Sequence, residues 1–184
     1  MVTLTDLDII SLIRKNNLNA DTLQEDVVRL LLEKGLKVAT AESCTGGLLS
    51  ERITRVSGSS SVFECGVCSY ANSIKQKVLG VQETTLSVLG AVSAETAVQM
   101  AEGVKKISGA DIGISTTGIA GPTGGTPEKP VGLVFLGVCT NSQSYALRLE
   151  LGGKENMKNS RDYIRKVTTD AALFTILDVI LSKK

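Results

Sequence analysis

Hydrophobic and polar positions follow two different periods along this chain, one typical of helices and one typical of strands. Segments with the two periods alternate through most of the sequence. Apolar residues three or four positions apart are typical of amphipathic helices, whereas short apolar runs or strict alternation are typical of strands. The helical period marks residues 4–13, 22–34, 48–55, 72–79, 93–107 and 155–181. The strand period marks residues 36–39, 62–70, 111–117, 131–139 and 144–151. This order predicts an α/β fold, a three-layer α/β/α sandwich whose mixed, mostly parallel sheet has about five strands.

Single residues mark where several of these helices begin and end. Thr22 and Glu25 have the spacing of a capping box, in which each side chain pairs with the other residue's backbone N–H group. Gly35 and Gly80 directly follow apolar helical stripes, and a left-handed glycine at such a place commonly ends a helix. We therefore expect a helix that starts near Thr22 and helix ends at the two glycines.

Length and composition limit the architecture. With 184 residues, 42% hydrophobic and 21% charged, the chain is long enough to form one globular domain with a sizeable core. The weakly amphipathic stretch at residues 4–13 ends in polar residues and precedes the regular pattern. We therefore expect a helical extension at residues 1–20 and a main domain at residues 21–184.

Charge and hydropathy limit the partners. A net charge of +1, no basic block longer than a Lys-Lys pair and only 3% aromatic residues argue against a nucleic-acid surface. No run of about 18 apolar residues is present, which argues against a helix that spans a membrane. The first residues, Met-Val-Thr-Leu-Thr-Asp, lack the basic region of a secretion signal. We expect a cytoplasmic protein with neither a nucleic-acid nor a membrane partner.

One polar stretch, Thr40-Ala41-Glu42-Ser43-Cys44-Thr45-Gly46-Gly47, lies between a predicted strand and a predicted helix. A tight turn at such a place lifts a side chain clear of the sheet and aims backbone N–H groups at a ligand. Ser43 offers a hydroxyl and Cys44 a thiol, while the two glycines let a ligand approach the backbone. The alternative interpretation is local, because Ser and Thr often precede a helix only to cap its free N–H groups.

The absence of histidine narrows the chemistry of this stretch. The chain contains no His, so Ser-His and Cys-His nucleophilic pairs and His-ligated metals are excluded within it. A hydrolytic site would need Lys, Tyr, Asp or Glu as its base. Cys65 and Cys68 have metal-ligand spacing, but no second pair completes a tetrahedral site, and on a strand they point to opposite faces. We expect buried free thiols and no metal ion.

Three polar segments follow predicted strands and are expected to converge. In an open α/β sheet, ligands bind beyond the carboxyl ends of parallel strands. The Ser43 turn, residues 70–75 and residues 116–118 occupy such positions. Lys75 would then lie beside a serine hydroxyl, with burial lowering its pKa so that it accepts a proton. The simpler alternatives are a solvated helix lysine and, for Tyr70, amphipathic packing at a strand end.

The segment at residues 118–130 and the closing helix suggest an anion site. This segment holds all three prolines and four glycines, so we expect it to be irregular. It matches neither Gly-x-Gly-x-x-Gly nor a Walker sequence, and a glycine-rich crossover is the alternative to a phosphate-binding loop. Arg161 and Arg165 lie one turn apart on the predicted closing helix and suit an anion, although surface arginines need no such role.

Together these segments closely resemble one family. Residues 40–47, residues 70–75, Gly90-Ala91-Val92-Ser93, and residues 117–122 with Lys129-Pro130-Val131-Gly132 are similar, in this order, to the motifs of the CinA C-terminal domain family. The resemblance covers about residues 22–181. Catalytic members of this family are nicotinamide-nucleotide amidases. The resemblance therefore implies hydrolysis of the carboxamide of nicotinamide mononucleotide to nicotinate mononucleotide and ammonia.

The resemblance also implies a catalytic set. Ser43 would be the nucleophile, Lys75 its general base and Tyr70 an assisting residue, and an acyl-enzyme would form and be hydrolysed by water. Backbone N–H groups of residues 44–47 would hold the oxyanion. No metal or cofactor is implied. We expect a homo-oligomer that acts on a small-molecule nucleotide.

The ribose phosphate of that nucleotide would bind Arg161, Thr117 and the backbone of residues 118–121. The expected substrate contacts are, in full, Thr45, Gly46, Gly47, Asn72, Thr117, Gly118, Ala120, Gly121 and Arg161.

The sequence departs from the family pattern in three places. Longer relatives carry an N-terminal domain that resembles molybdopterin-binding proteins, and no activity of that domain is transferred to this chain. Residues 71–73 read Ala-Asn-Ser where the family usually has Ser-Asn-Glu, so a helper carboxylate beside Lys75 is missing. Residues 159–160 read Asn-Ser where the family usually has Gly-Asp. A non-catalytic nucleotide-binding or regulatory domain and an assembly module are the rival interpretations, but neither needs both Ser43 and Lys75.

Overall fold

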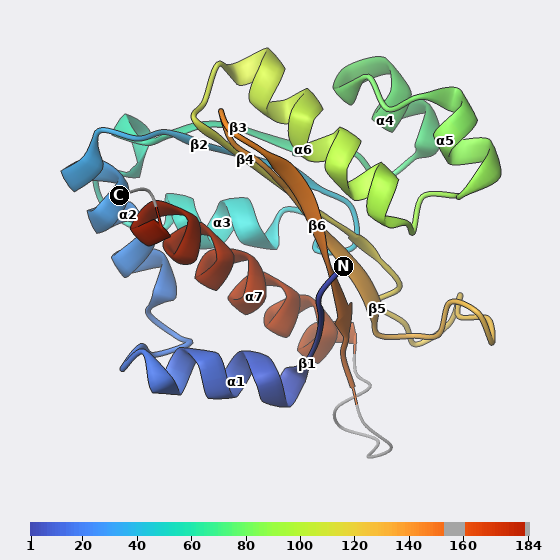
Figure 1. Cartoon of the computed structure of the whole chain (residues 1–184), viewed down its shortest axis with the longest axis horizontal. Coiled ribbons are helices and arrows are strands. Elements are labelled where there is room, and N and C mark those ends of the chain that lie inside the picture. Colours follow the sequence, from blue (N-terminus) through green and yellow to red (C-terminus); the bar gives the residue numbers. More distant parts are fainter. Residues whose placement is uncertain (153–160, 183–184) are drawn as a thin grey trace.

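A mixed sheet of six strands forms the middle layer of the protein (Figure 1). The computed structural model describes residues 1–152 and 161–182. The order across the sheet is β1-β6-β5-β4-β2-β3, in which β2 runs parallel to β3 and β4, β1 runs parallel to β6, and β5 runs antiparallel to both neighbours. The strands are β1 (Thr3–Thr5), β2 (Val38–Glu42), β3 (Phe63–Cys68), β4 (Ile112–Gly118), β5 (Leu133–Cys139) and β6 (Ser144–Glu150).

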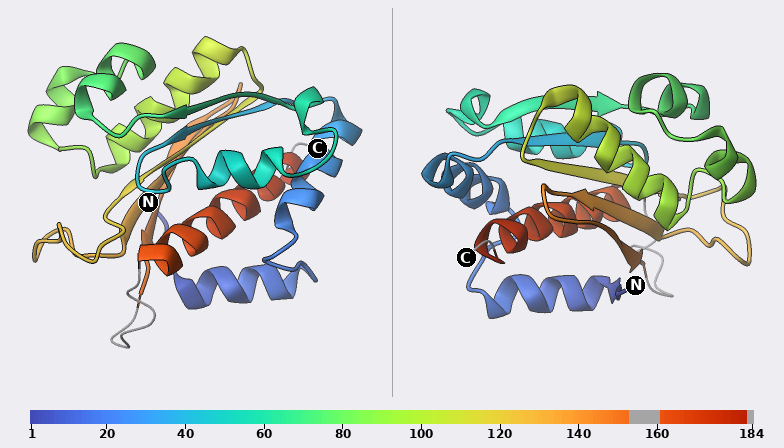
Figure 2. Two further views of the ribbon diagram at one scale, coloured as in Figure 1. Left: turned by 180° about the vertical axis from the view of Figure 1, so that it is seen from behind. Right: turned by 45° about the horizontal axis from the view of Figure 1, so that its top comes forward.

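Helices cover both faces of this sheet, which confirms the predicted three-layer α/β/α sandwich (Figures 1 and 2). One face carries α4 (Asn72–Leu79), α5 (Glu83–Val88) and α6 (Ala94–Ser108). The other face carries α1 (Asp6–Lys15), α2 (Leu23–Lys34), α3 (Leu48–Thr54) and α7 (Arg161–Ser182). A short 3-10 helix, Ser59–Ser61, precedes β3. Over the described ranges, every helix is too short or too polar to cross a bilayer.

Both faces of the sheet are buried against apolar helix residues. On the face that carries α6, two glycines let the helix approach the strands closely, because a Cβ on Gly113 would lie 2.2 Å from the Ala101 carbonyl oxygen and one on Gly137 would lie 2.0 Å from that of Ala97. On the other face a large core forms, and its fully buried members include Leu23, Leu31, Leu49, Ile53, Ile112, Ile114, Leu136, Leu149, Ile164 and Leu173.

The sixth strand comes from the N-terminus. The pattern predicts a helix over residues 4–13, but Thr3–Thr5 pairs with β6 and the helix begins at Asp6. Thr5 and Asp8 form a capping box, in which the Thr5 N–H donates to the Asp8 carboxylate at 2.8 Å and the Asp8 N–H donates to the Thr5 hydroxyl at 3.3 Å. Ile9 and Ile13 then join the main core, so the N-terminal extension packs directly on the rest of the domain.

Local signals for the helix ends succeed more often than they fail. Gly35 and Gly80 adopt φ of 62° and 70° and end α2 and α4, as predicted. The predicted capping box at Thr22 is wrong, because Thr22 makes no side-chain capping bond and the Gln24 amide donates to the Asp21 carbonyl instead. The pattern does not predict α5. Residues 155–160 of the predicted closing helix lie outside the described residues.

Candidate active site

Ser43 and Lys75 meet at the carboxyl ends of the parallel strands. Ser43 directly follows β2, and Lys75 lies in the first turn of α4, which follows β3. The Ser43 Oγ and Lys75 Nζ atoms are 3.0 Å apart, within hydrogen-bond distance. The structure therefore brings together the two residues that the sequence predicts as nucleophile and base.

Lys75 is buried without an acidic partner. Its side chain is 1% exposed, and its Nζ donates to the carbonyl oxygens of Ser69 and Tyr70 at 2.7 and 3.4 Å. In the described part of the chain no carboxylate forms an ion pair with it. Burial lowers the pKa of Lys75. A lysine in these surroundings is suited to accept a proton from Ser43.

Hydrogen bonds between neighbouring strands hold the two residues in place. β2 is longer than the sequence pattern predicts, because it continues through Glu42 and takes the first part of the predicted polar turn into the sheet. The Ser43 N–H then donates to the Thr116 carbonyl of β4 at 2.9 Å. The Ser69 N–H donates to the Glu42 carbonyl at 2.8 Å, directly before the segment that holds Lys75. The expected convergence of the three strand ends is therefore confirmed.

Sequence reasoning missed Glu42 as a functional candidate. Its side chain is 1% exposed and accepts hydrogen bonds from residues of the following turn and of α3. The available signal was an acidic residue in the turn before a helix, because a carboxylate is stabilised near the N-terminal end of a helix.

Few backbone N–H groups of the turn are available to an oxyanion. From the sequence, the N–H groups of all of residues 44–47 are expected to hold the oxyanion. In the structure the Gly46 N–H donates to the Ser43 carbonyl and the Gly47 N–H donates to Glu42. Within this turn, only the N–H groups of Cys44 and Thr45 have no oxygen acceptor among the residues that the structure describes. The two glycines adopt φ of 59° and 94°, so the turn itself requires them.

Burial assigns Cys44 and Thr45 to the support of the turn. Burial raises the pKa of the Cys44 thiol to about 12, which leaves it protonated at neutral pH and a weak nucleophile. The hydroxyl of Thr45 is also buried and donates to Glu42 at 2.6 Å. The Thr45 side chain is therefore not free to contact a substrate. Arg165 holds the Thr45 carbonyl from Nε and Nη2 at 3.2 and 2.9 Å, so it braces the turn.

Tyr70, Arg161 and Gly121 form a cluster. The Tyr70 side chain is 63% exposed, and its hydroxyl accepts from Arg161 Nη2 at 2.7 Å. Arg161 Nη1 donates to the Gly121 carbonyl at 3.1 Å. Tyr70 therefore contacts Lys75 with its backbone carbonyl, while its hydroxyl pairs with Arg161. We call these three residues the arginine rim.

The other predicted substrate contacts differ in exposure. Thr117 is buried, and its hydroxyl donates to the Ala91 carbonyl at 2.6 Å, so the side chain braces a neighbouring loop. Gly118 is the last residue of β4 and lies so close to the Leu133 carbonyl that a side chain would not fit there. Ala120 is buried. Asn72 is exposed as the first residue of α4. The predicted departure at residues 159–160 lies outside the described residues.

All four cysteines are free. The expectation of buried thiols holds for Cys44 and Cys139, but it is wrong for the two cysteines of the edge strand β3, because Cys65 is half-buried and Cys68 is exposed. Over residues 1–152 and 161–182, the structure contains no group of three Cys, Asp or Glu side chains suited to hold a metal ion.

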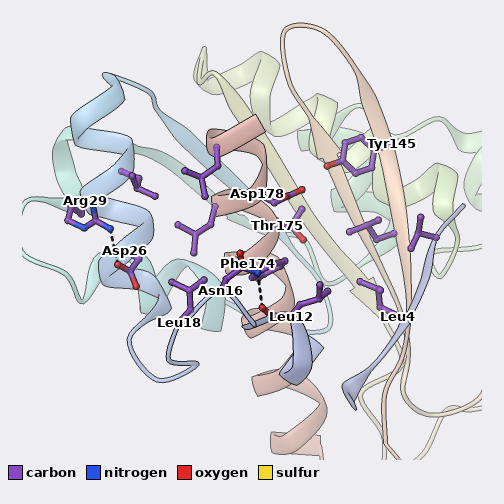
Figure 3. A pocket seen from close by; sticks show the side chains of 15 residues that line it. Leu4, Leu12, Asn16, Leu18, Asp26, Arg29, Tyr145, Phe174, Thr175 and Asp178 are labelled. Carbon is purple, nitrogen blue, oxygen red and sulfur yellow. Dashed lines mark hydrogen bonds and ion pairs between the residues drawn. The ribbon is translucent and has the colours of Figure 1, made fainter. Parts of the chain in front are cut away.

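A separate apolar hollow of about 620 Å³ lies between α1, α2, β6 and α7 (Figure 3). Its polar lining includes the Asp26–Arg29 ion pair and the Asn16 amide, which donates to the Leu12 carbonyl. The hollow has the size of a ligand pocket, but its lining residues include no Ser, Cys or Lys. The chemistry therefore places the candidate active site at Ser43 and Lys75.

Comparison with known proteins assigns the family. A sequence model of the CinA C-terminal domain matches residues 20–180. The chain belongs to the CinA C-terminal domain family. The CinA-like protein of Kosmotoga olearia is 52% identical over 152 residues, which cover 79% of this chain and 37% of that protein. The chain spans little more than a third of the length of the curated relatives that it matches.

Crystal structures of CinA proteins share the fold. The competence/damage inducible protein CihA from Agrobacterium tumefaciens has a TM-score of 0.82 at 38% identity, over 89% of this chain and 96% of that one. The competence damage-inducible protein A (ComA) from Klebsiella pneumoniae subsp. pneumoniae MGH 78578 has a TM-score of 0.83 at 29% identity, over 90% and 99%. The CinA domain thus accounts for nearly all of the structure described here.

Proposed function

We propose that this CinA domain is an amidase that hydrolyses the carboxamide of nicotinamide mononucleotide to nicotinate mononucleotide and ammonia. The observation that carries the proposal is the 3.0 Å contact between the Ser43 hydroxyl and the amine of Lys75, a buried lysine whose pKa is lowered by burial. A solvated helix lysine or a simple capping serine would need neither the contact nor the burial. The family resemblance supports the choice of substrate.

In the proposed mechanism, the neutral amine of Lys75 takes the Ser43 proton as Oγ attacks the carboxamide carbon. The N–H groups of Cys44 and Thr45 stabilise the oxyanion that forms. The Lys75 ammonium then protonates the departing nitrogen, and ammonia leaves an acyl-enzyme. Water attacks the ester carbon while Lys75 again accepts a proton, and that proton returns to Ser43 as the product leaves. The product leaves as the carboxylic acid and gives its remaining proton to the solvent when it ionises.

The arginine rim is the proposed site for the ribose phosphate. Arg161 brings a guanidinium group close to the exposed Tyr70 and to the Gly121 loop, and guanidinium groups bind phosphate with two parallel hydrogen bonds. A non-catalytic nucleotide-binding domain would use this rim in the same way, but it would have no use for the Ser43–Lys75 contact.

The direct test is to incubate the purified protein with nicotinamide mononucleotide and to measure ammonia and nicotinate mononucleotide together. The proposal requires equal amounts of both products, formed in proportion to enzyme concentration. The Ser43→Ala variant is the control for a contaminating amidase. Binding of the nucleotide without release of ammonia would favour the non-catalytic alternative.

Arg161→Ala is expected to lower kcat/KM for nicotinamide mononucleotide by about 10- to 150-fold, because a hydrogen bond to a charged group contributes about 1.5–3 kcal/mol. The loss should be small for nicotinamide riboside, which has no phosphate. Both substrates are to be measured with wild type, Arg161→Ala and Arg55→Ala, whose exposed arginine pairs with Glu51 on α3. Equal losses on both substrates would mean that Arg161 serves the fold or the chemistry instead.

Removal of divalent metal ions is expected to leave turnover unchanged, because the proposed base and oxyanion donors all belong to the chain. The rate of ammonia release is to be compared before and after prolonged dialysis against a chelator. Activity that falls on dialysis and returns with zinc or another divalent ion would contradict the serine–lysine mechanism.

A further inference from the structure

We infer that Glu42 is a positioning residue for the Ser43 nucleophile, an inference that rests on the proposed function. Glu42 is the last residue of β2, directly before Ser43, and its side chain is 1% exposed. No ion pair compensates its carboxylate within the described part of the chain. A buried carboxylate is costly unless hydrogen bonds satisfy it, so its position needs a physical reason.

Five donors surround the two carboxylate oxygens. Oε2 accepts from the Thr45 hydroxyl at 2.6 Å and from the N–H groups of Gly47 and Leu49, both at 3.0 Å. Oε1 accepts from the N–H and the hydroxyl of Ser50, at 2.8 and 2.5 Å. Every partner belongs to the turn after Ser43 or to α3. One side chain therefore fixes the end of β2 to the whole segment that follows it.

Two further hydroxyls extend this network into the sheet. The Thr45 hydroxyl is 2.7 Å from that of Thr116 on β4, and the Ser50 hydroxyl is 2.7 Å from that of Thr40 on β2. The hydroxyl protons of Thr45 and Ser50 are both donated to Glu42. The Thr45 oxygen therefore accepts from Thr116, and the Ser50 oxygen accepts from Thr40. The direction of all four hydroxyl groups is thus set by the carboxylate.

This arrangement determines what the turn offers to a substrate. Glu42 binds the N–H of Gly47, and the Gly46 N–H closes the turn on the Ser43 carbonyl. The N–H groups left for an oxyanion are those of Cys44 and Thr45, next to the Ser43 hydroxyl. We therefore assign Glu42 the orientation of the nucleophile and of these two donors, without contact to the substrate.

A glutamine cannot take over this role. A carboxamide has one acceptor oxygen and one NH₂ donor, whereas each carboxylate oxygen of Glu42 faces at least one backbone N–H. Backbone N–H groups cannot reverse, so either orientation of a glutamine would place two donors against each other. The turn has to shift to relieve this conflict.

Glu42→Gln is expected to lower kcat for ammonia release by about 100-fold, the cost of a misplacement of about 1 Å at a reacting group. KM should change by less than about threefold, because the arginine rim is left intact. Glu51→Gln is the matched control, since it makes the same chemical change at an exposed residue of α3 and should behave like wild type. Parallel losses in kcat and in folded fraction, with the remaining folded protein fully active, would overturn the inference.

A second variant covers the case in which Glu42→Gln does not fold. Ser50→Ala removes only one of the five donors and leaves the carboxylate in place. It should lower kcat by about threefold or more at unchanged KM. Wild-type kcat in Ser50→Ala would then overturn the inference.

Labelling of Ser43 by a fluorophosphonate, followed by intact mass, gives a readout that does not depend on the natural substrate. We expect Glu42→Gln to label at least about tenfold more slowly than wild type and Glu51→Gln to label at the wild-type rate. Equal rates for Glu42→Gln and wild type would overturn the inference. If wild type labels at Ser43 but releases no ammonia, the proposed substrate fails while the labelling ratio still decides the role of Glu42. If wild type does not label, Ser43 is not the nucleophile and the inference fails with it.

Discussion

Replacing Ser43 with alanine is expected to lower kcat for ammonia release from nicotinamide mononucleotide by about four orders of magnitude or more, as for other covalent nucleophiles. The alanine removes the only side-chain atom that would bond to the substrate. Lys75 keeps its hydrogen bonds to the Ser69 and Tyr70 carbonyls, so the free energy of unfolding should change by about 1 kcal/mol or less. Steady-state rates and a denaturant unfolding curve on the same preparation separate the two effects.

The adjacent cysteine provides the control for this experiment. Cys44→Ala should keep most of the activity, because burial raises the pKa of the Cys44 thiol to about 12 and little thiolate exists at neutral pH. An inactive Cys44→Ala beside an active Ser43→Ala would move the role of nucleophile to the thiol.

Replacing Lys75 with methionine is expected to lower kcat by about 10²- to 10⁴-fold, the usual contribution of a general base. Methionine is similar in length and tolerates burial, so the first turn of α4 should keep its packing. Lys75→Arg sharpens the test, because an arginine keeps the positive charge but cannot act as a base near neutral pH. An active Lys75→Arg variant would mean that Lys75 contributes a positive charge and does not act as the general base.

The pH profile is the second readout of the same prediction. Burial lowers the pKa of Lys75 from its usual value of 10.5, and the base works only in its neutral form. kcat/KM should therefore rise with pH, level off above this lowered pKa, and lose the rising limb in Lys75→Met. A rising limb that persists in Lys75→Met would assign it to another group.

Much of the fold follows from local pattern. The glycines after α2 and α4 end their helices because a left-handed residue is needed there, and the strand periods mark all but one strand. β1 could not be predicted in this way, because a strand of three residues is too short to show a period. Its pairing with β6 also depends on a partner some 145 positions away, since Thr3 pairs with Arg148. Thr22 fails for a related reason, since its backbone conformation, which the sequence pattern does not contain, leaves its hydroxyl without the expected bond.

The candidate site also has a part that the sequence predicts and a part that it does not. The meeting of Ser43 and Lys75 was predictable because parallel strands end at one edge of the sheet, and topology alone places them. The pairing of the Tyr70 hydroxyl with Arg161, and of Thr117 with the Ala91 carbonyl, depends on side-chain directions that no spacing rule encodes. Glu42 was hidden because its five donors become neighbours only after the turn has folded.

The position of the two reacting residues in the sheet has a mechanical consequence. Ser43 follows β2, which lies between β3 and β4. Lys75 is held by carbonyls just beyond β3, and among the described strands β3 is at the edge of the sheet and pairs only with β2. The strand that carries the nucleophile is therefore paired on both sides, whereas the strand that precedes its base is paired on one. A ligand or force that separated β3 from β2 would shift the Ser69 and Tyr70 carbonyls that hold Lys75, and would thereby change the 3.0 Å distance between Ser43 Oγ and Lys75 Nζ.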